Sequence, residues 1–134
     1  IEEIVHKTGL TDTELKALIW ERGYINGENI VADTAEPKAI QVLKTPTKEI
    51  GALRVYPADK GAGSVLTGIK LIKSLKIYIH KNSHKVREDF ENYCWEIDER
   101  TDTETGKVAH PYSHSPDAVR YLVMKLFRKV LKNS

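Results

Sequence analysis

Two acidic residues occupy positions from which carboxylates often carry out chemistry. Asp33 directly follows the apolar residues 30–32, and a short apolar run of this kind predicts a buried strand. Asp33 would then lie at the carboxyl end of that strand, where binding sites gather in open α/β sheets. Asp117 opens the amphipathic C-terminal segment, so its carboxylate would lie near the free N–H groups and the positive dipole end of a helix.

This pair of acids is compatible with metal chemistry. Mg²⁺ binds through one or two carboxylates, with water and phosphate oxygens in its remaining positions. Two such ions about 4 Å apart activate water and stabilise the leaving oxygen during phosphodiester cleavage. Each acid also has an ordinary explanation: Asp33 as a turn or N-cap residue, and Asp117 as a first-turn acid that only stabilises its helix.

The elements that would position these acids alternate between strand and helix patterns. A T-x-x-E capping box at Thr11 and Glu14 begins one helix, and Pro37 fits the first turn of another. The predicted helices span residues 11–23, 37–43, 65–74, 83–93 and 116 onward. The predicted strands span residues 29–32, 51–56, 76–80 and the start of 95–98, with a strand end at 1–6 and a polar turn at 101–107. This alternation predicts an α/β fold with a largely parallel sheet in its helix-flanked part.

The C-terminal helix has the strongest amphipathic pattern in the chain. Its predicted apolar stripe, which should pack on the sheet, consists of Val119, Leu122, Val123, Leu126 and Val130. Its basic residues, predicted to stay in solvent, are Lys125, Arg128, Lys129 and Lys132. These cations, and another series at Lys70, Lys73 and Lys76, either meet phosphates or simply solvate a helix face.

Composition limits the possible classes of protein. The chain has 134 residues, of which 40% are hydrophobic and 30% charged, values typical of one soluble globular domain. Its net charge of +2 does not by itself indicate a nucleic-acid binder. The single cysteine, Cys94, excludes an internal disulfide, and its two aromatic neighbours predict a core strand. No apolar run approaches the roughly 20 residues of a membrane helix, so no membrane association is expected.

Four segments of the chain resemble, in the same order, motifs of one protein family. Residues 32–40 read ADTAEPKAI and resemble the family's aDxAeP motif. Residues 58–69 read ADKGAGSVLTGI, and residues 83–95 end in NYCW, both similar to family segments. Residues 114–121 read HSPDAVRY and resemble the motif HaiDAlRY. The family that these motifs resemble is the nuclease domains of bacteriophage terminase large subunits, and the resemblance implies an RNase H-like mixed sheet flanked by helices.

The resemblance also implies roles for individual residues. Asp33 matches the second catalytic carboxylate and Asp117 the third, both as metal ligands. His114 matches a catalytic histidine that either tunes a carboxylate or contacts phosphate. Lys60 matches a lysine that contacts phosphate or a carboxylate, and Arg120 an arginine that is either structural or faces DNA.

Two departures from the family pattern affect these expectations. Asp89 stands where the family usually carries glutamate, which predicts a changed support contact and unchanged chemistry. The strand with the family's first catalytic aspartate has no counterpart here, and Glu3 aligns only loosely after that region. We therefore expect residues 1–134 to form one N-terminally truncated nuclease domain with weak activity by itself.

The function that the resemblance implies is that of a two-metal-ion endodeoxyribonuclease using Mg²⁺ or Mn²⁺. It would cut concatemeric viral DNA during genome packaging in the cytoplasm of a bacterial host, encoded by a phage or prophage. The implied partners are double-stranded DNA, an ATPase motor domain on the same polypeptide, a small terminase subunit and the portal protein. The alternatives are a non-catalytic α/β DNA-binding or assembly module and another RNase H-like nuclease of resolvase or transposase type. The motifs at 32–37 and 114–121 favour a terminase.

Overall fold

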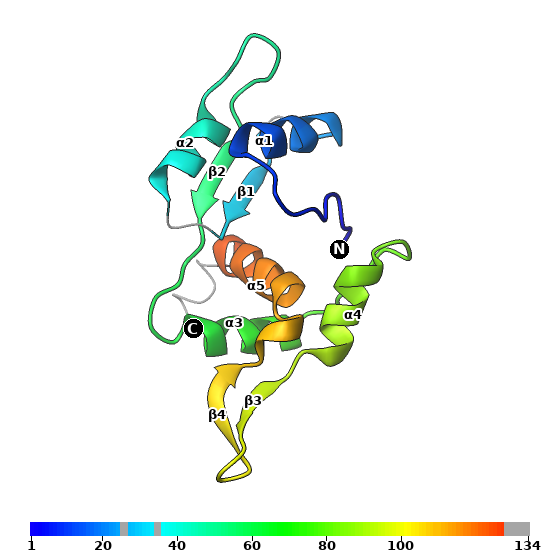
Figure 1. Ribbon diagram of the computed structural model, residues 1–134, viewed down its shortest axis with the longest axis vertical. Helices are drawn as coiled ribbons and strands as arrows, with labels where there is room; N and C mark the ends of the chain where they lie inside the picture. The colour runs from blue at the N-terminus through cyan, green and yellow to red at the C-terminus, as the bar shows by residue number, and fades with distance from the viewer. Residues whose placement is uncertain (25–26, 34–35, 128–134) are drawn as a thin grey trace.

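A computed structural model describes residues 1–24, 27–33 and 36–127 of the chain (Figure 1). In chain order the elements are α1 (Asp12–Glu21), β1 (Asn29–Ala32), α2 (Pro37–Lys44), β2 (Arg54–Pro57), α3 (Ser64–Lys73), α4 (His84–Asn92), β3 (Trp95–Asp98), β4 (Thr103–Val108), a 3₁₀ turn (His110–Tyr112) and α5 (His114–Leu126). None of the helices described is long and apolar enough to cross a membrane.

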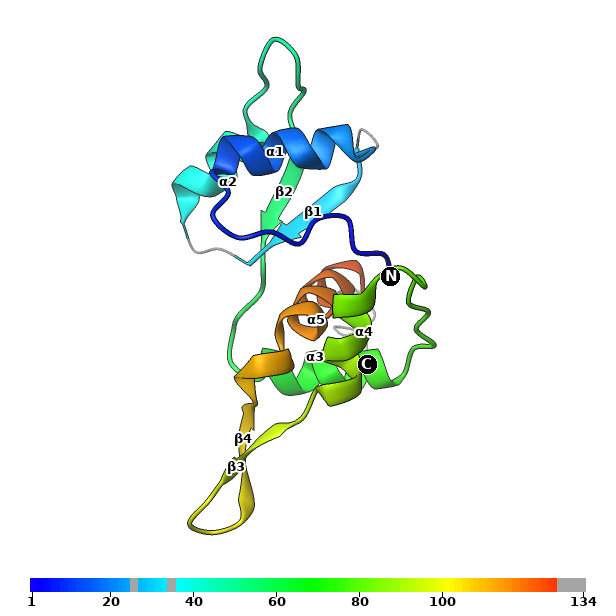
Figure 2. The same cartoon turned by 45° about the vertical axis from the view of Figure 1, so that its right-hand side comes forward.

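Strands β1 and β2 form a parallel pair, with Ile30 opposite Val55 and Ala32 opposite Pro57. Helices α1 and α2 lie on one side of this pair, and the carboxyl ends of both strands point toward α5 (Figures 1 and 2). Helix α5 contacts β1, α3 and α4. The β3–β4 hairpin projects away from the rest of the structure in both views. The element that carries Asp117 therefore lies beneath the strand that positions Asp33.

Helices α1 and α2 begin where their capping box and proline predicted. Glu14 N donates to Thr11 Oγ1 at 3.1 Å, and Thr11 Oγ1 donates to Glu14 Oε1 at 3.0 Å. Helix α2 begins with Pro37, whose fixed φ and missing N–H suit the first helical position. Gly63, at φ 76°, precedes α3, a left-handed conformation that glycine adopts without steric cost.

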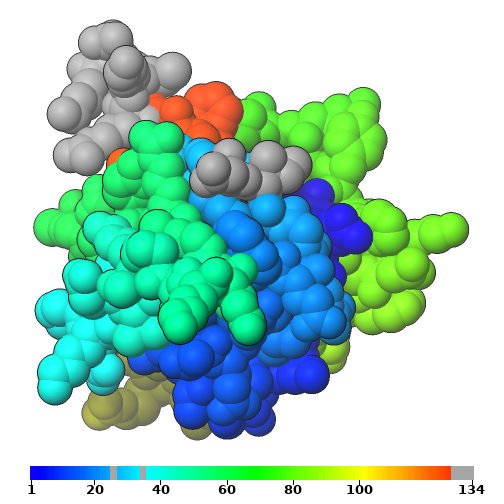
Figure 3. Space-filling model, turned by 90° about the horizontal axis from the view of Figure 1, so that it is seen from above, coloured from blue at the N-terminus to red at the C-terminus, as the bar shows by residue number. Residues whose placement is uncertain are grey.

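The apolar core under α1 and α2 is small and well enclosed. Leu43, Leu53 and Val55 are buried, with partly buried neighbours from α1, β1 and α2 packed against them. From above, α1, α2 and the segment that leads into β2 cover this core (Figure 3). The burial of these side chains supplies the apolar stabilisation of this layer and fixes the register of the strand pair.

Two strand predictions were wrong. The described strands form two separate two-stranded sheets, and residues 76–80 are in neither. In that segment, Ile1 N donates to Tyr78 O at 2.5 Å and His80 N donates to Ile1 O at 2.7 Å. Two hydrogen bonds to one residue are too few for a strand. The same applies to residues 1–6, which are not assigned to a strand.

The predicted polar turn at 101–107 is also wrong, because Thr103–Val108 forms β4 and pairs antiparallel with β3. Most of β4 is exposed, so its sequence lacks the apolar alternation that identifies a half-buried strand. Asp102, at φ 54°, provides the tight turn of the hairpin. Cys94 is exposed, which corrects its prediction as a core residue: it precedes β3 in this projecting hairpin.

The predicted apolar stripe of α5 is wrong in part. Val123 is buried and Val119 half-buried, but Leu122 and Leu126 are exposed. Val130, together with the basic residues Arg128, Lys129 and Lys132, lies outside the described residues. The buried residues of α5 are Pro116, Arg120, Tyr121, Val123 and Met124. The helix is therefore rotated relative to the prediction, because a polar residue, Arg120, lies on its inward face.

This rotation predicts different costs for two leucine substitutions. Leu53→Ala should lower the free energy of unfolding by about 2–5 kcal/mol, because it leaves a cavity in a closed core. Leu122 is 38% exposed, so Leu122→Ala should cost about 1 kcal/mol or less. Urea denaturation of both variants measures the difference. Equal losses would show that α5 packs through the face predicted from its apolar stripe.

Candidate functional site

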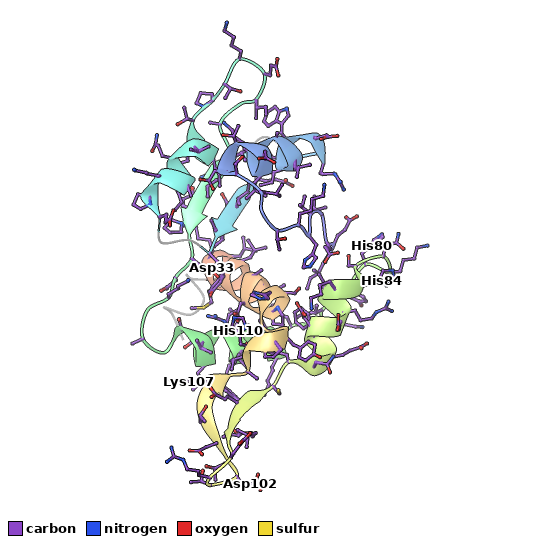
Figure 4. The ribbon with its side chains drawn as sticks, in the orientation of Figure 1. Asp33, His80, His84, Asp102, Lys107 and His110 are labelled. Carbon is purple, nitrogen blue, oxygen red and sulfur yellow. The ribbon has the colours of Figure 1, made fainter. Side chains whose placement is uncertain are left out.

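Asp33 lies where two neighbouring strands end. Ala58 N donates to Ala32 O at 2.9 Å, so the chain leaves β1 and β2 at the same edge. The loop after β2 then brings the Lys60 ammonium into an ion pair with the Asp33 carboxylate. Both side chains are about half exposed, at 55% for Lys60 and 53% for Asp33. Figure 4 shows Asp33 next to α5 and below the end of β1.

Lys60 connects this edge to α5. Its Nζ lies 5.9 Å from the centroid of the Tyr121 ring. The hydrogen bond to Asp33 raises the pKa of Lys60, and the negative charge of Asp117 raises it further. Lys60 thus pairs with the acid that follows β1 and lies near Tyr121, four positions (121 minus 117) beyond the acid of α5.

The Asp117 carboxylate pairs with Arg120, a residue of the same helix. The Arg120 Nη2 lies 3.4 Å from Asp117 Oδ1, and the exposed fractions of their side chains are 5% and 26%. The guanidinium can lie this deep because α3 presents Gly68 beneath it. A Cβ at Gly68 would overlap Arg120 Cγ and Cδ. The resemblance implies that Arg120 either has a structural role or faces DNA. The burial of the Arg120 side chain favours the structural role, and a DNA contact stays a prediction.

Tyr93 adds a polar group to this interior. Burial raises the pKa of the Tyr93 hydroxyl, and the nearby charge of Asp117 raises it further. Among the described residues, neither the Tyr93 hydroxyl nor Arg120 Nε has a hydrogen-bond partner. The environment of Asp117 is therefore polar and partly enclosed on its inner side, where one buried cation faces it.

A carboxylate from α4 fixes the beginning of α5. Ser115 donates to Asp89 Oδ2 twice, from N at 3.1 Å and from Oγ at 2.7 Å. Lys85 Nζ lies 3.0 Å from Asp89 Oδ1. Ser113 forms no side-chain cap, so the fully buried Asp89 provides the N-terminal cap from outside the helix. Burial opposes its ionisation, but the bonds from Ser115 and Lys85 prevail and lower its pKa.

His114, the first residue of α5, is exposed. Its ring lies edge-on to that of His110, with 5.2 Å between the centroids. Next to them, a hollow of about 300 Å³ opens between α5 and the base of the hairpin, and Lys107, His110, Asp117 and Arg120 are among the residues that line it. The predicted catalytic role of His114 stays a prediction.

The donors fit a hard divalent cation in type. Asp33 and Asp117 offer carboxylate oxygens, which Mg²⁺ and Mn²⁺ prefer over softer ligands. Within residues 1–24, 27–33 and 36–127, no group of three or more acidic, histidine or cysteine side chains gathers that could hold a metal ion. Metal binding by this pair would therefore depend on water or substrate oxygens for the remaining positions.

Comparison with known families decides the membership of the chain. The model of the terminase RNase H-like domain matches residues 1–125. The chain belongs to this family. The fold of the terminase domain is similar to that of the large terminase nuclease domain of bacteriophage SPP1, solved with bound Mn, with a TM-score of 0.68 and 24% sequence identity. The alignment covers 87% of this chain and 64% of the SPP1 chain. No curated protein sequence matches the terminase domain significantly.

These findings confirm the predicted family and the RNase H-like α/β fold. Three uncharged residues of the site, Gly68, Tyr93 and Tyr121, were not predicted from the sequence. Gly68 and Tyr121 lie inside two of the quoted motifs, and the signal for Gly68 was a glycine within a predicted helix, which usually marks a close approach. Tyr93 gave no such signal, because an aromatic residue is most simply explained as packing.

The close approach at Gly68 generates a prediction. Gly68→Ala should lower the free energy of unfolding by about 1–3 kcal/mol, because the added methyl group displaces Arg120 and overpacks the interface. Thr67→Ala, at an exposed position of the same helix, should change it by about 0.5 kcal/mol or less. Thermal or urea denaturation compares the two. Stabilisation by Gly68→Ala, as helix propensity alone predicts, would contradict the packing of Arg120 against α3.

The cap from Asp89 generates a second prediction. Asp89→Ala should cost about 2–4 kcal/mol, because it leaves the Ser115 N–H and the Lys85 ammonium without their acceptor. Since folding lowers the pKa of Asp89 below 3.8, the unfolded chain takes up this proton first. The contribution of ionised Asp89 to the free energy of unfolding is therefore present above about pH 4 and is lost on further acidification.

Urea denaturation at pH 7 and pH 3 measures this dependence. Asp89→Asn should lose less stability between these pH values than the wild type. Glu91→Gln, at an exposed position of α4, serves as the control. An equal loss in the wild type and Asp89→Asn would show that Asp89 does not cap α5 as an anion.

Proposed function

We propose that the terminase domain is a divalent-metal-dependent DNA endonuclease that cuts viral DNA during genome packaging. The observation that carries this proposal is the ion pair of Asp33 with Lys60 at the carboxyl ends of β1 and β2, with Lys60 also near the Tyr121 ring of α5, the helix that carries Asp117. Family membership supports it, as does the likeness to a phage nuclease domain solved with bound Mn. The reaction class follows from the donors, because carboxylates that hold hard cations next to cationic side chains suit phosphodiester hydrolysis.

In this proposal Asp33 and Asp117 hold Mg²⁺ or Mn²⁺. When bound, the metal lowers the pKa of water and neutralises developing charge on phosphate oxygens. Lys60, which pairs with Asp33 in the structure, would be the cation that contacts a phosphate oxygen when Asp33 holds the metal. Arg120, 3.4 Å from Asp117 Oδ1, fixes the direction of this carboxylate. His114, exposed at the start of α5, contacts phosphate or tunes the Asp117 carboxylate.

Two carboxylates are few for two divalent ions, which repel each other. We infer that a third carboxylate from outside the described residues completes a two-metal site, and that residues 1–134 alone are a weak nuclease. In the cell, the proposed partners are double-stranded DNA, an ATPase motor domain on the same polypeptide, a small terminase subunit and the portal protein. The activity would belong to the cytoplasm of a bacterial host.

A non-catalytic DNA-binding module is the second candidate. The observation that favours it is the lack, within the described residues, of any cluster of three or more potential metal ligands. The two candidates differ in their response to charge removal at Asp33 and Asp117. A nuclease loses cleavage when either carboxylate becomes an amide, whereas a binding module has no cleavage to lose.

Plasmid cleavage with Mg²⁺ or Mn²⁺ tests the proposal. The proteins to compare are this chain and a version extended at its N-terminus to complete the family fold, each with Asp33→Asn or Asp117→Asn. We expect the extended protein to cut and both amide variants to lose at least about 100-fold in rate, as when a main electrostatic group is removed from a catalytic site. Asp12→Asn, in the first turn of α1, is the matched control and should cut normally.

The outcomes separate the two candidates. Unchanged cutting by the extended Asp117→Asn protein would remove Asp117 from the metal site. An extended parent that never cuts with either metal, while remaining folded, would favour the binding module.

A further inference from the structure

We propose that the hollow between the end of β2 and the C-terminal half of α5 binds the sugar-phosphate backbone of duplex DNA beside the metal site. This inference rests on the proposed function, since it gives the path of the substrate away from the reacting carboxylates. The hollow has a volume of about 250 Å³. Its lining residues are Val31, Tyr56, Pro57, Asp59, Tyr121, Met124 and Lys125.

The floor of this hollow is mainly apolar. Tyr121 and Met124 come from the buried face of α5, and Val31 and Pro57 from the ends of the two parallel strands. Such a surface suits the apolar faces of deoxyribose, while the phosphates on either side require cations. A surface for bases would instead need a free aromatic face for stacking.

Cations contact Tyr56, one of the residues that line the hollow. Lys125 Nζ lies 3.9 Å from the centroid of the Tyr56 ring, and Arg54 Nε donates to the Tyr56 hydroxyl at 2.9 Å. The bond from Arg54 lowers the pKa of Tyr56, and the positive charges of Arg54, Lys125 and Lys44 lower it further. Two cations, from β2 and α5, thus contact one side chain.

These cations are available to an external anion. Among the described residues, the salt bridges involve Lys60, Lys85 and Arg120 as cations, and none joins Lys44, Arg54 or Lys125 to a carboxylate. Because the Lys125 ammonium covers the Tyr56 ring, that face is not open for a base to stack. The arrangement therefore favours recognition of the backbone and predicts binding independent of sequence.

The hollow is continuous with the candidate metal site. Tyr121 lines it, and the ring of Tyr121 is the one near Lys60, which pairs with Asp33. The second hollow, at the base of the hairpin, is lined by Lys107 and Arg120, but Arg120 already pairs with Asp117. In the first hollow, the one carboxylate among the lining residues, Asp59, accepts from the backbone N of Gly61 at 3.0 Å and pairs with none of the described cations there. We therefore assign the DNA path to the side of Tyr56 and Lys125.

Fluorescence anisotropy of a labelled duplex tests this surface without cleavage. The full 134-residue chain is titrated in EDTA, so that binding is measured in the absence of metal. Lys125→Gln and Arg54→Gln should each weaken binding roughly fivefold to tenfold at about 0.1 M salt. Each should also reduce the slope of log affinity against log salt by about 0.9, the value for one lost phosphate contact. Changing the sequence of the duplex should have no effect.

The control is Lys48→Gln, which removes an exposed cation from the segment between α2 and β2, before the amino end of β2 and away from the carboxyl ends of the strands. It should bind duplex DNA as the wild type does. Wild-type affinity in both Lys125→Gln and Arg54→Gln would overturn the proposal, as would failure of the wild type to bind duplex DNA or stronger binding to single strands. If the N-terminally extended protein needs Lys125 and Arg54 for binding but never cuts with either metal, this surface is supported and the nuclease is refuted.

Discussion

Helix α5 contacts β1, α3 and α4 at the same time, and the depth at which it packs determines where Asp117 lies. Two polar contacts set that depth and direction. Asp89 receives both donors of Ser115 and fixes the first turn, and Arg120 enters the space that Gly68 leaves open on α3. Buried polar groups are costly unless they are paired, so the bonds from Ser115 to Asp89 select one position of the first turn, and the fit of the Arg120 side chain over Gly68 selects the face that α5 turns toward α3.

The candidate site consequently has a rigid half and an exchangeable half. Asp117 is partly enclosed and faces a guanidinium that is almost completely buried. Asp33 pairs with an exposed lysine, and exposed ion pairs contribute little net stability. A divalent cation would therefore replace Lys60 as the partner of Asp33 at small cost, and a phosphate would compete with Asp33 for the Lys60 ammonium, while Asp117 keeps its contact with Arg120. This division suits a site in which substrate and metal have to enter together.

The sequence predicted the parts of this site that depend on local signals. The apolar run before Asp33 marked a strand end, and the position of Asp117 marked a first helical turn. The rotation of α5 could not be predicted in this way, because periodicity assigns Leu122 to the core and cannot anticipate that a glycine on another helix admits an arginine. The hairpin strand β4 was missed for a related reason, since an exposed strand has no apolar pattern to reveal it.

Membership in the terminase RNase H-like family places these contacts in a fold whose relative from phage SPP1 was solved with bound Mn. The central claim for this chain is that Asp33 and Asp117 share a divalent cation. Paramagnetic broadening of amide NMR signals by substoichiometric Mn²⁺ measures this directly. The account predicts that the signals flanking positions 33 and 117 and the signal of Lys60 broaden first, and that those at the hairpin tip near Asp102 stay sharp. Broadening that begins at the hairpin, or at other surface acids, and spares positions 33 and 117 would contradict it.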